Sequence, residues 1–175
     1  MNKPFIVLSA ILLLLAGCAS SVTKDIMVDT DVDPKANLKG YSTYTWLGSA
    51  AIVYDPEGQW EPPQFDMDSE IKFLIDRELR THGMTESSSS PDLIVAFAAG
   101  IDMATMEIKT DPDSKLETLE NVPMGALSVV LIDANTGFAV WGGIATAEVQ
   151  QNPDPAIIKQ RLDYAVSSMF KQLKK

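Results

Sequence analysis

The feature that most constrains this chain is an apolar segment, Phe5 to Leu15, that ends shortly before its only cysteine, Cys18. One cation, Lys3, precedes the segment, and the small residue Gly17 follows it. A positive start, an apolar stretch of about a dozen residues and a small-residue junction form the pattern of a secretory signal. The segment is too short to span a bilayer, which takes roughly 20 apolar residues. We therefore expect residues 1–17 to be a signal peptide that is cleaved off.

The junction itself, Leu15-Ala16-Gly17-Cys18, resembles the lipobox of bacterial lipoproteins. The resemblance implies cleavage before Cys18, a diacylglycerol on its thiol and usually a third acyl chain on its new amine. One thiol cannot form an internal disulfide, and an exported free thiol would be reactive, so acylation accounts for a lone cysteine. Each buried methylene contributes about 0.8 kcal/mol, so several chains make the anchor close to permanent. A plain signal peptide with a chance cysteine is the alternative.

The residues after the cysteine bear on location. Ala19 and Ser20 follow the cysteine, and neither is the aspartate that retains a lipoprotein in the inner membrane in enterobacterial-type sorting. We therefore expect anchoring in the outer membrane, on its periplasmic face. Residues 18–22 would form a lipidated tether, in which three or four extended residues reach only about 10 to 15 Å. Residues 23–175 would form a single α+β domain held close to the membrane.

The mature chain is strongly acidic. The sequence has 14 basic and 24 acidic residues, and removal of residues 1–17 takes away one lysine and no acid, which leaves a formal charge of about −11. Such a charge repels phosphate backbones and anionic headgroups, so we expect no nucleic-acid partner. It permits a cationic partner or loosely held divalent ions, although solubility alone also accounts for it.

The mature chain contains segments with strand patterns and segments with helix patterns. A period of two or a content of β-branched and aromatic residues predicts strands over 20–30, 42–47, 93–108, 126–132 and 138–149. The stretch 93–108 is read as one long central strand, because it is apolar on both faces at its start. The last two strands form a hairpin, with Asp133 and Gly137 in its turn. Trp141 should pack on this sheet.

Two helices are predicted from caps and apolar stripes. The first starts at Asp66 or Asp68 and ends at Gly83, and the second starts at Asp154 and Pro155. The core-facing stripe of the second helix contains Ile158, Leu162, Ala165, Met169 and Leu173. We therefore expect an α+β fold: an antiparallel or mixed sheet of four to six strands with two helices packed on one face.

Two acidic stretches, 48–66 and 110–125, show no sustained period. The first is broken by prolines and is expected to be a loop with an exposed Trp60; the second is expected to be a mobile excursion between strands. Loops on a rigid scaffold are where binding residues concentrate, so both are candidate partner-binding surfaces, or else solvated excursions without a partner. The candidate residues are Trp60 as an aromatic anchor and Asp111, Asp113, Glu117 and Glu120 as steering charges.

Several groups of residues, taken in order, resemble a family of small Gram-negative lipoproteins, domain of unknown function 4136. They are Asp31-x-Asp33-Pro34 with Tyr41-x-Thr43-Tyr44-x-Trp46, His82-Gly83-Met84, Pro91-Asp92-Leu93-Ile94-Val95, and Leu131-Ile132-Asp133-x-x-Thr136-Gly137-x-x-Val140-Trp141. The resemblance covers nearly the whole mature chain and implies a fold and an envelope location. The family has no assigned activity, so the resemblance implies no reaction.

Catalytic and metal-binding patterns point to structural roles. A hydrolytic nucleophile needs a neighbouring base, usually histidine. The only histidine, His82, ends a predicted helix, where a cationic imidazole would interact favourably with the exposed backbone carbonyls. Asp29, Asp31 and Asp33 have the spacing of calcium ligands, yet the rest of that loop is missing, so a strand end and turn are expected. Met103 and Met106 are read as core residues rather than copper ligands. We expect no cofactor and no bound metal.

These inferences favour a non-catalytic envelope lipoprotein. It would bind the membrane through the acyl chains on Cys18, and an unknown envelope protein or polymer through its two loops. One alternative is a periplasmic hydrolase that uses carboxylates near the 48–66 loop. Another is a structural lipoprotein that associates with itself through a sheet edge. Converging buried carboxylates would favour the enzyme, whereas an apolar patch or an open edge strand would favour the binding protein.

Overall fold

The computed structural model describes residues 22–113, 115–150, 153–171 and 173. The expected signal peptide, residues 1–17, and Cys18 lie outside this part of the chain, so cleavage and lipidation stay predictions. Most of the expected tether, 18–22, lies outside it as well. No helix among the described residues has the length and apolar character needed to cross a membrane.

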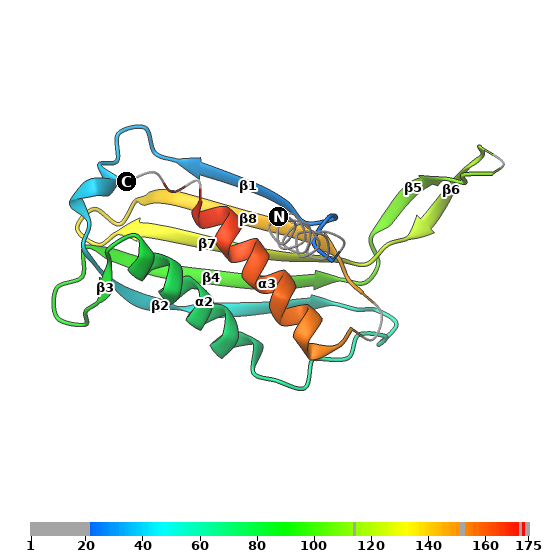
Figure 1. Ribbon diagram of the computed structural model, residues 1–175, viewed down its shortest axis with the longest axis horizontal. Helices are drawn as coiled ribbons and strands as arrows, with labels where there is room; N and C mark the ends of the chain where they lie inside the picture. Colours follow the sequence, from blue (N-terminus) through cyan, green and yellow to red (C-terminus); the bar gives the residue numbers. More distant parts are fainter. Residues whose placement is uncertain (1–21, 114, 151–152, 172, 174–175) are drawn as a thin grey trace, which may run out of the picture.

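Six strands form one mixed sheet (Figure 1). In spatial order they are β1 (Met27–Val32), β8 (Ala139–Glu148), β7 (Met124–Asp133), β4 (Leu93–Asp102), β2 (Thr43–Tyr54) and β3 (Thr85–Glu86). Neighbours run antiparallel from β1 to β4, whereas β2 is parallel to both β4 and β3. The predicted hairpin is β7 with β8. In its turn, Asp133 Oδ1 accepts the backbone N–H groups of Asn135 and Thr136 at 2.9 and 2.8 Å. Gly137 completes the turn at φ 74°.

Two helices cross one face of this sheet (Figure 1): α2 (Met67–Thr81) and α3 (Pro155–Phe170). Each begins after an aspartate, Asp66 or Asp154, whose side chain accepts a backbone N–H of the first turn at 3.0 or 2.8 Å. Gly83, at φ 74°, ends α2. The predicted α+β class, the two caps and the placement of both helices on one face are confirmed. A short 3-10 turn, Leu38–Gly40, precedes β2.

The core fills the space between the sheet and the helices. Its fully buried side chains include Tyr44, Ile75, Leu93 and Phe170. Trp141 is 2% exposed, and its ring centroid lies 5.0 Å from that of Phe170, so the predicted packing of Trp141 on the sheet is confirmed. Burial of each large apolar side chain contributes roughly 1.5–3 kcal/mol. The core therefore fixes the helices on this face.

Residues that carry the family resemblance meet at one end of the sheet. The Asp92 carboxylate, just before β4, accepts four hydrogen bonds from the amides and hydroxyls of Ser42 and Thr43, at 2.8–3.0 Å. The Tyr41 hydroxyl donates to Asp133 Oδ2 at 2.7 Å. Burial and the Asp133 carboxylate raise the pKa of Tyr41 to about 12. These bonds fasten the beginnings of β2 and β4 and the β7–β8 turn, so this part of the motif has a structural role.

Asp92→Asn is expected to lower the free energy of unfolding at neutral pH by about 1–2 kcal/mol, because a carboxylate accepts these bonds more strongly than an amide. The amide of Ser42, together with Thr43, lowers the pKa of Asp92 to about 2. Since the unfolded value is about 3.9, this stabilisation is complete above that pH and is lost as the pH falls towards 2. Urea unfolding at several pH values should therefore show the deficit of the variant shrinking below about pH 4.

Asp113→Asn is the control for this measurement, because Asp113 is exposed and far along the sequence from this cluster. It should behave like the unsubstituted protein at every pH. A stability deficit of Asp92→Asn that stays constant from neutral to acid pH would contradict the role assigned to the carboxylate.

The strand expected over 42–47 is longer than predicted. β2 continues to Tyr54, so residues 48–54 are strand and the expected loop begins only at residue 55. A bulge between Trp46 and Gly48 allows the strand to continue, and Gly48 adopts φ 154°, a value that favours glycine. Beyond the bulge the segment pairs with β4 in parallel register.

The strand expected over 93–108 is interrupted. β4 ends at Asp102, whose side chain accepts the N–H of Ala104 at 2.8 Å and so turns the chain. β5 (Met106–Thr110) then pairs with β6 (Glu117–Asn121) in a separate two-stranded sheet. This hairpin, residues 106–121, projects from the end of the main sheet (Figure 1) and is called the arm below. The stretch 110–125, expected to be an excursion between strands, thus contains β6 and the adjoining ends of β5 and β7.

The first strand starts later than predicted. Residues 22–25 form a turn, and β1 begins at Met27 rather than near residue 20. Arg161 of α3 accounts for this turn, because its guanidinium donates to the Val22 carbonyl and to both carboxylate oxygens of Asp25, at 2.8 and 2.6 Å. This bidentate contact lowers the pKa of Asp25.

Candidate functional site

A groove of about 1110 Å³ opens at the end of the sheet opposite to the Asp92 cluster. It lies between the helix-facing side of the sheet, the first turns of α2 and α3, the base of the arm and residues 55–65, called the strap below. Its lining is mainly apolar and includes Ala51, Val53, Phe97, Ala99, Ile101, Leu127, Ala145, Ile158 and Leu162. A concave, mainly apolar cavity of this size is typical of a binding site.

The apolar stripe of α3 shows how the groove arises. Ala165, Met169 and Leu173 are buried in the core, as predicted. Ile158 and Leu162, earlier in the same stripe, are only half-buried and line the groove. The start of α3 therefore faces the groove, which the strap also lines.

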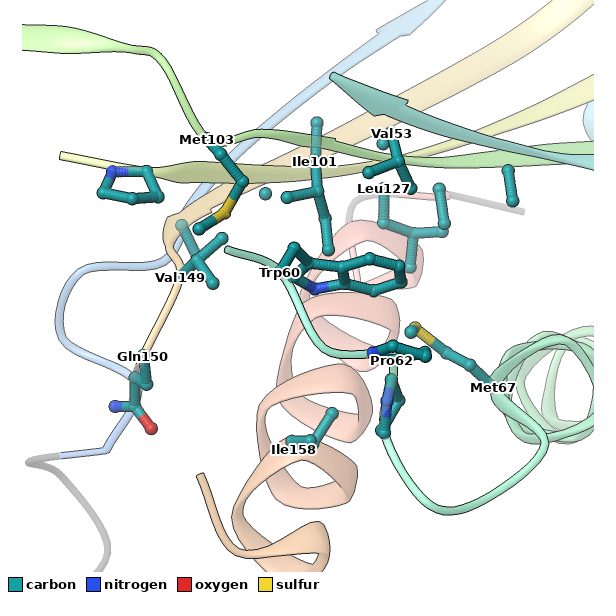
Figure 2. A pocket seen from close by; sticks show the side chains of 18 of the residues that line it. Val53, Trp60, Pro62, Met67, Ile101, Met103, Leu127, Val149, Gln150 and Ile158 are labelled. Atoms are coloured by element: carbon teal, nitrogen blue, oxygen red, sulfur yellow. The ribbon is translucent and has the colours of Figure 1, made fainter. Parts of the chain in front are cut away.

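Trp60 lies inside the groove. Figure 2 shows its ring between the sheet residues Ile101 and Leu127 on one side and Pro62 and Met67 on the other. The residue is half-buried. The expectation that Trp60 is exposed is therefore wrong, and its role as a binding anchor stays a prediction.

Both ends of the strap are held by defined contacts. Asp55 Oδ2 accepts the N–H of Trp60 at 2.7 Å, which lowers the pKa of Asp55, and Gly58 at φ 66° allows the tight turn between them. At the other end, Lys159 Nζ of α3 lies 5.0 Å from the centre of the Phe65 ring. These contacts aim the indole of Trp60 towards the sheet.

The rim of the groove is negatively charged. Four carboxylates line it without forming an ion pair to any described residue; they are Asp55, Glu57, Glu61 and Asp68. The other two charged lining residues are paired, Arg161 with Asp25 and Glu148 with Lys109. Three of the four rim acids are exposed and Asp55 is half-buried. They do not converge as buried groups, so the arrangement suits recognition of a basic partner better than acid–base chemistry.

The arm carries the remaining residues predicted from the sequence. Asp111, Asp113, Glu117 and Glu120 are exposed there and do not line the groove. Met103 and Asn121, at the base of the arm, do line it. The fold therefore brings the stretches 48–66 and 110–125 to the same end of the sheet. It does not bring the four arm acids together with Trp60 in the groove. Met106 is 49% exposed on the arm, so the expectation that it fills the core is wrong.

Other candidate sites take structural positions. Among the described residues, no group of three or more histidine, cysteine, aspartate or glutamate side chains could hold a metal ion. Asp29 and Asp31 lie on β1 and Asp33 begins the following turn, as predicted. His82 caps the end of α2 and lies against the ring of Phe170, with 6.4 Å between ring centroids.

The mixed sheet and its two helices define a small α+β protein with an open groove at one end of the sheet. A family model, Domain of unknown function (DUF4136), matches residues 28–173. The chain belongs to this family, and the resemblance seen in the sequence is confirmed.

Several solved structures are similar to this chain, and the first one named here shows the same fold. A DUF4136 family protein from Bacteroides thetaiotaomicron is 15% identical, with 85% of this chain and 96% of the other covered and a TM-score of 0.56. A PelC dodecamer from Paraburkholderia phytofirmans is 17% identical, with 85% and 99% covered and a TM-score of 0.47. A lipoprotein from Neisseria meningitidis is 12% identical, with 75% and 97% covered and a TM-score of 0.33. Comparison with curated protein sequences gives no match. The family has no assigned function.

Proposed function

We propose that this protein is a non-catalytic envelope lipoprotein that binds an apolar part of another envelope component in the groove. Acyl chains on Cys18 would hold it in the outer membrane, with its domain on the periplasmic side. The anchor is supported by the apolar segment and the lone cysteine of the sequence. The binding role is carried by one observation, the largely apolar groove of about 1110 Å³ into which Trp60 points.

The energetics of the groove favour an apolar occupant. A bound segment that removes about 200 Å² of apolar surface from water gains about 5 kcal/mol, before the entropic cost of association. Trp60 supplies a large aromatic surface of the kind that dominates binding sites. The exposed rim acids add charge selectivity rather than a reacting pair.

Ala99→Leu is expected to weaken binding of the apolar fluorophore Nile red by about tenfold, because the larger side chain occupies the floor of the groove. Ala99 lies on β4 between two other lining residues, Phe97 and Ile101. Fluorescence titration of residues 19–175, made without the anchor and first checked for cooperative unfolding, measures the dissociation constant.

Ala98→Leu is the matched control, because Ala98 precedes Ala99 on the same strand, points to the other face of the sheet and does not line the groove. It should bind the fluorophore like the unsubstituted domain. Equal weakening by both substitutions, or no binding by the unsubstituted domain, would reject the groove as a binding site.

A further inference from the structure

The two edges of the main sheet differ in how they are protected. At the β1 edge, Asp29 Oδ1 accepts the N–H of Thr30 and Asp31 Oδ1 accepts the N–H of Val32, both at 2.9 Å. In the antiparallel pairing with β8, these amides point away from the sheet. Each aspartate thus occupies a donor that an added strand would need. Charged residues on an edge strand are a common protection against pairing with other chains.

The edge formed by β2 has no such protection. β3 pairs only with Thr43 and Tyr44, so Leu47–Tyr54 has no strand partner on that side among the described residues. This segment is exposed over its whole length and contains no charged residue and no proline. A row of unpaired N–H and C=O groups at strand spacing is complementary to another polypeptide backbone.

This free edge borders the groove. Ala51 pairs with Ala99 and Val53 with Ile101 in the parallel register of β2 with β4, and all four residues line the groove. Side chains of neighbouring strands in register lie on the same face. A strand added to β2 would therefore place every second side chain at the groove, near Trp60.

The charge of the rim selects the kind of segment. Four acids of the strap and the start of α2 line the groove without an ion pair to any described residue, and the protein as a whole has a formal charge of −10. The exposed hairpin that a second copy could offer, the arm, carries five acids and two lysines. Like charges would oppose that pairing, whereas a basic segment would be attracted. Charge complementarity therefore favours a different polypeptide over a second copy.

We propose that the bound part of the partner is an extended polypeptide segment, apolar at alternate positions and flanked by basic residues. It pairs as an added strand with Leu47–Tyr54, and its apolar side chains enter the groove. The proposal rests on the proposed function, because it specifies which apolar component the groove holds. Backbone hydrogen bonds supply affinity in this mode, and the groove supplies selectivity for alternate side chains.

The test uses the full-length protein in phosphatidylcholine nanodiscs and a fluorescent peptide of alternating valine and threonine with two lysines at each end. Binding is followed by fluorescence anisotropy, with empty nanodiscs as the control for membrane association. Each peptide of a series carries one N-methyl group, placed at a different backbone amide. The methyl group removes the N–H donor and blocks strand pairing on the side to which that amide points. Successive amides of a strand point to opposite sides. Methylation should therefore weaken binding more than about tenfold at every second amide and less than about twofold at those between.

The charge of the rim is tested with the same peptide. Glu57→Gln with Glu61→Gln should weaken binding about threefold at low salt and have little effect at high salt, because the charges are screened. The matched control is Asp29→Asn with Asp31→Asn, which removes the same charge from the opposite edge of the sheet and should leave binding unchanged.

Several outcomes would overturn the proposal. The first is that the peptide does not bind at millimolar concentration, and the second is that N-methylation weakens binding equally at successive amides. The third is that a peptide with glutamates in place of the lysines binds equally well. The fourth is that this protein forms a dimer that excludes the peptide. If the domain still binds Nile red and Ala99→Leu still weakens it, the proposed function stands and only the strand addition fails. Loss of Nile red binding as well would remove both.

Discussion

Cys18→Ser is expected to abolish the lipid mass of the mature protein and to remove the protein from the outer-membrane fraction. The reason is that acylation needs the thiol, and two or three acyl chains hold a protein far more firmly than one chain does. Mass spectrometry of the purified protein and fractionation of the cells measure the two effects. Ser20→Ala, two residues later, is the control and should change neither. A native protein without lipid mass, together with a variant that still sediments with membranes, would contradict the anchor.

Gly143→Ala is expected to lower the free energy of unfolding by about 2 kcal/mol, because the core has no room for the added methyl group. A Cβ atom at this position would lie 2.8 Å from the Trp141 ring and 3.0 Å from Met169 Sδ. Trp141 is 2% exposed, so its ring cannot move aside without disturbing the core. Urea unfolding measures the loss.

The neighbouring glycine is a matched control for this substitution. A Cβ atom at Gly142 would lie 3.9 Å from the Val129 carbonyl oxygen, which is an ordinary van der Waals distance. Gly142→Ala should therefore stay within about 1 kcal/mol of the native protein. Equal stability of the two variants would show that the packing of Trp141 over β8 is looser than described.

The parts of the fold that depend on local chemistry could be predicted from the sequence. Asp66 and Asp154 begin helices, and Gly83 and Gly137 take the positive φ of a helix end and a hairpin turn, because each of these residues acts on its immediate neighbours. The second half of β2 was missed for the opposite reason. Gly48 reads as the start of a loop, and only its pairing with β4 shows that it sits in a bulge. The uncharged, strand-forming residues after it were the available signal.

The groove could be predicted only in part. Trp60 was identified, but its burial depends on Asp55, Gly58 and the distant residues of β4 and β7. Ile158 and Leu162 look like core positions in the sequence, because a stripe that faces a cavity has the same period as one that faces a core. The Asp92 cluster lies at the other end of the sheet, which explains why the family motif predicts the fold without revealing this site.

Photocrosslinking in intact cells tests the binding role of the groove most directly. A photoreactive phenylalanine derivative in place of Gln59, which is exposed and lines the groove, is expected to capture a specific envelope component. The same derivative in place of Asn135, exposed in the turn between β7 and β8 and outside the groove lining, should not capture it. Adding Ala99→Leu to the Gln59 variant should weaken the captured band, whereas adding Ala98→Leu should not. No product at position 59, or the same product at both positions, would contradict the groove as the site of binding.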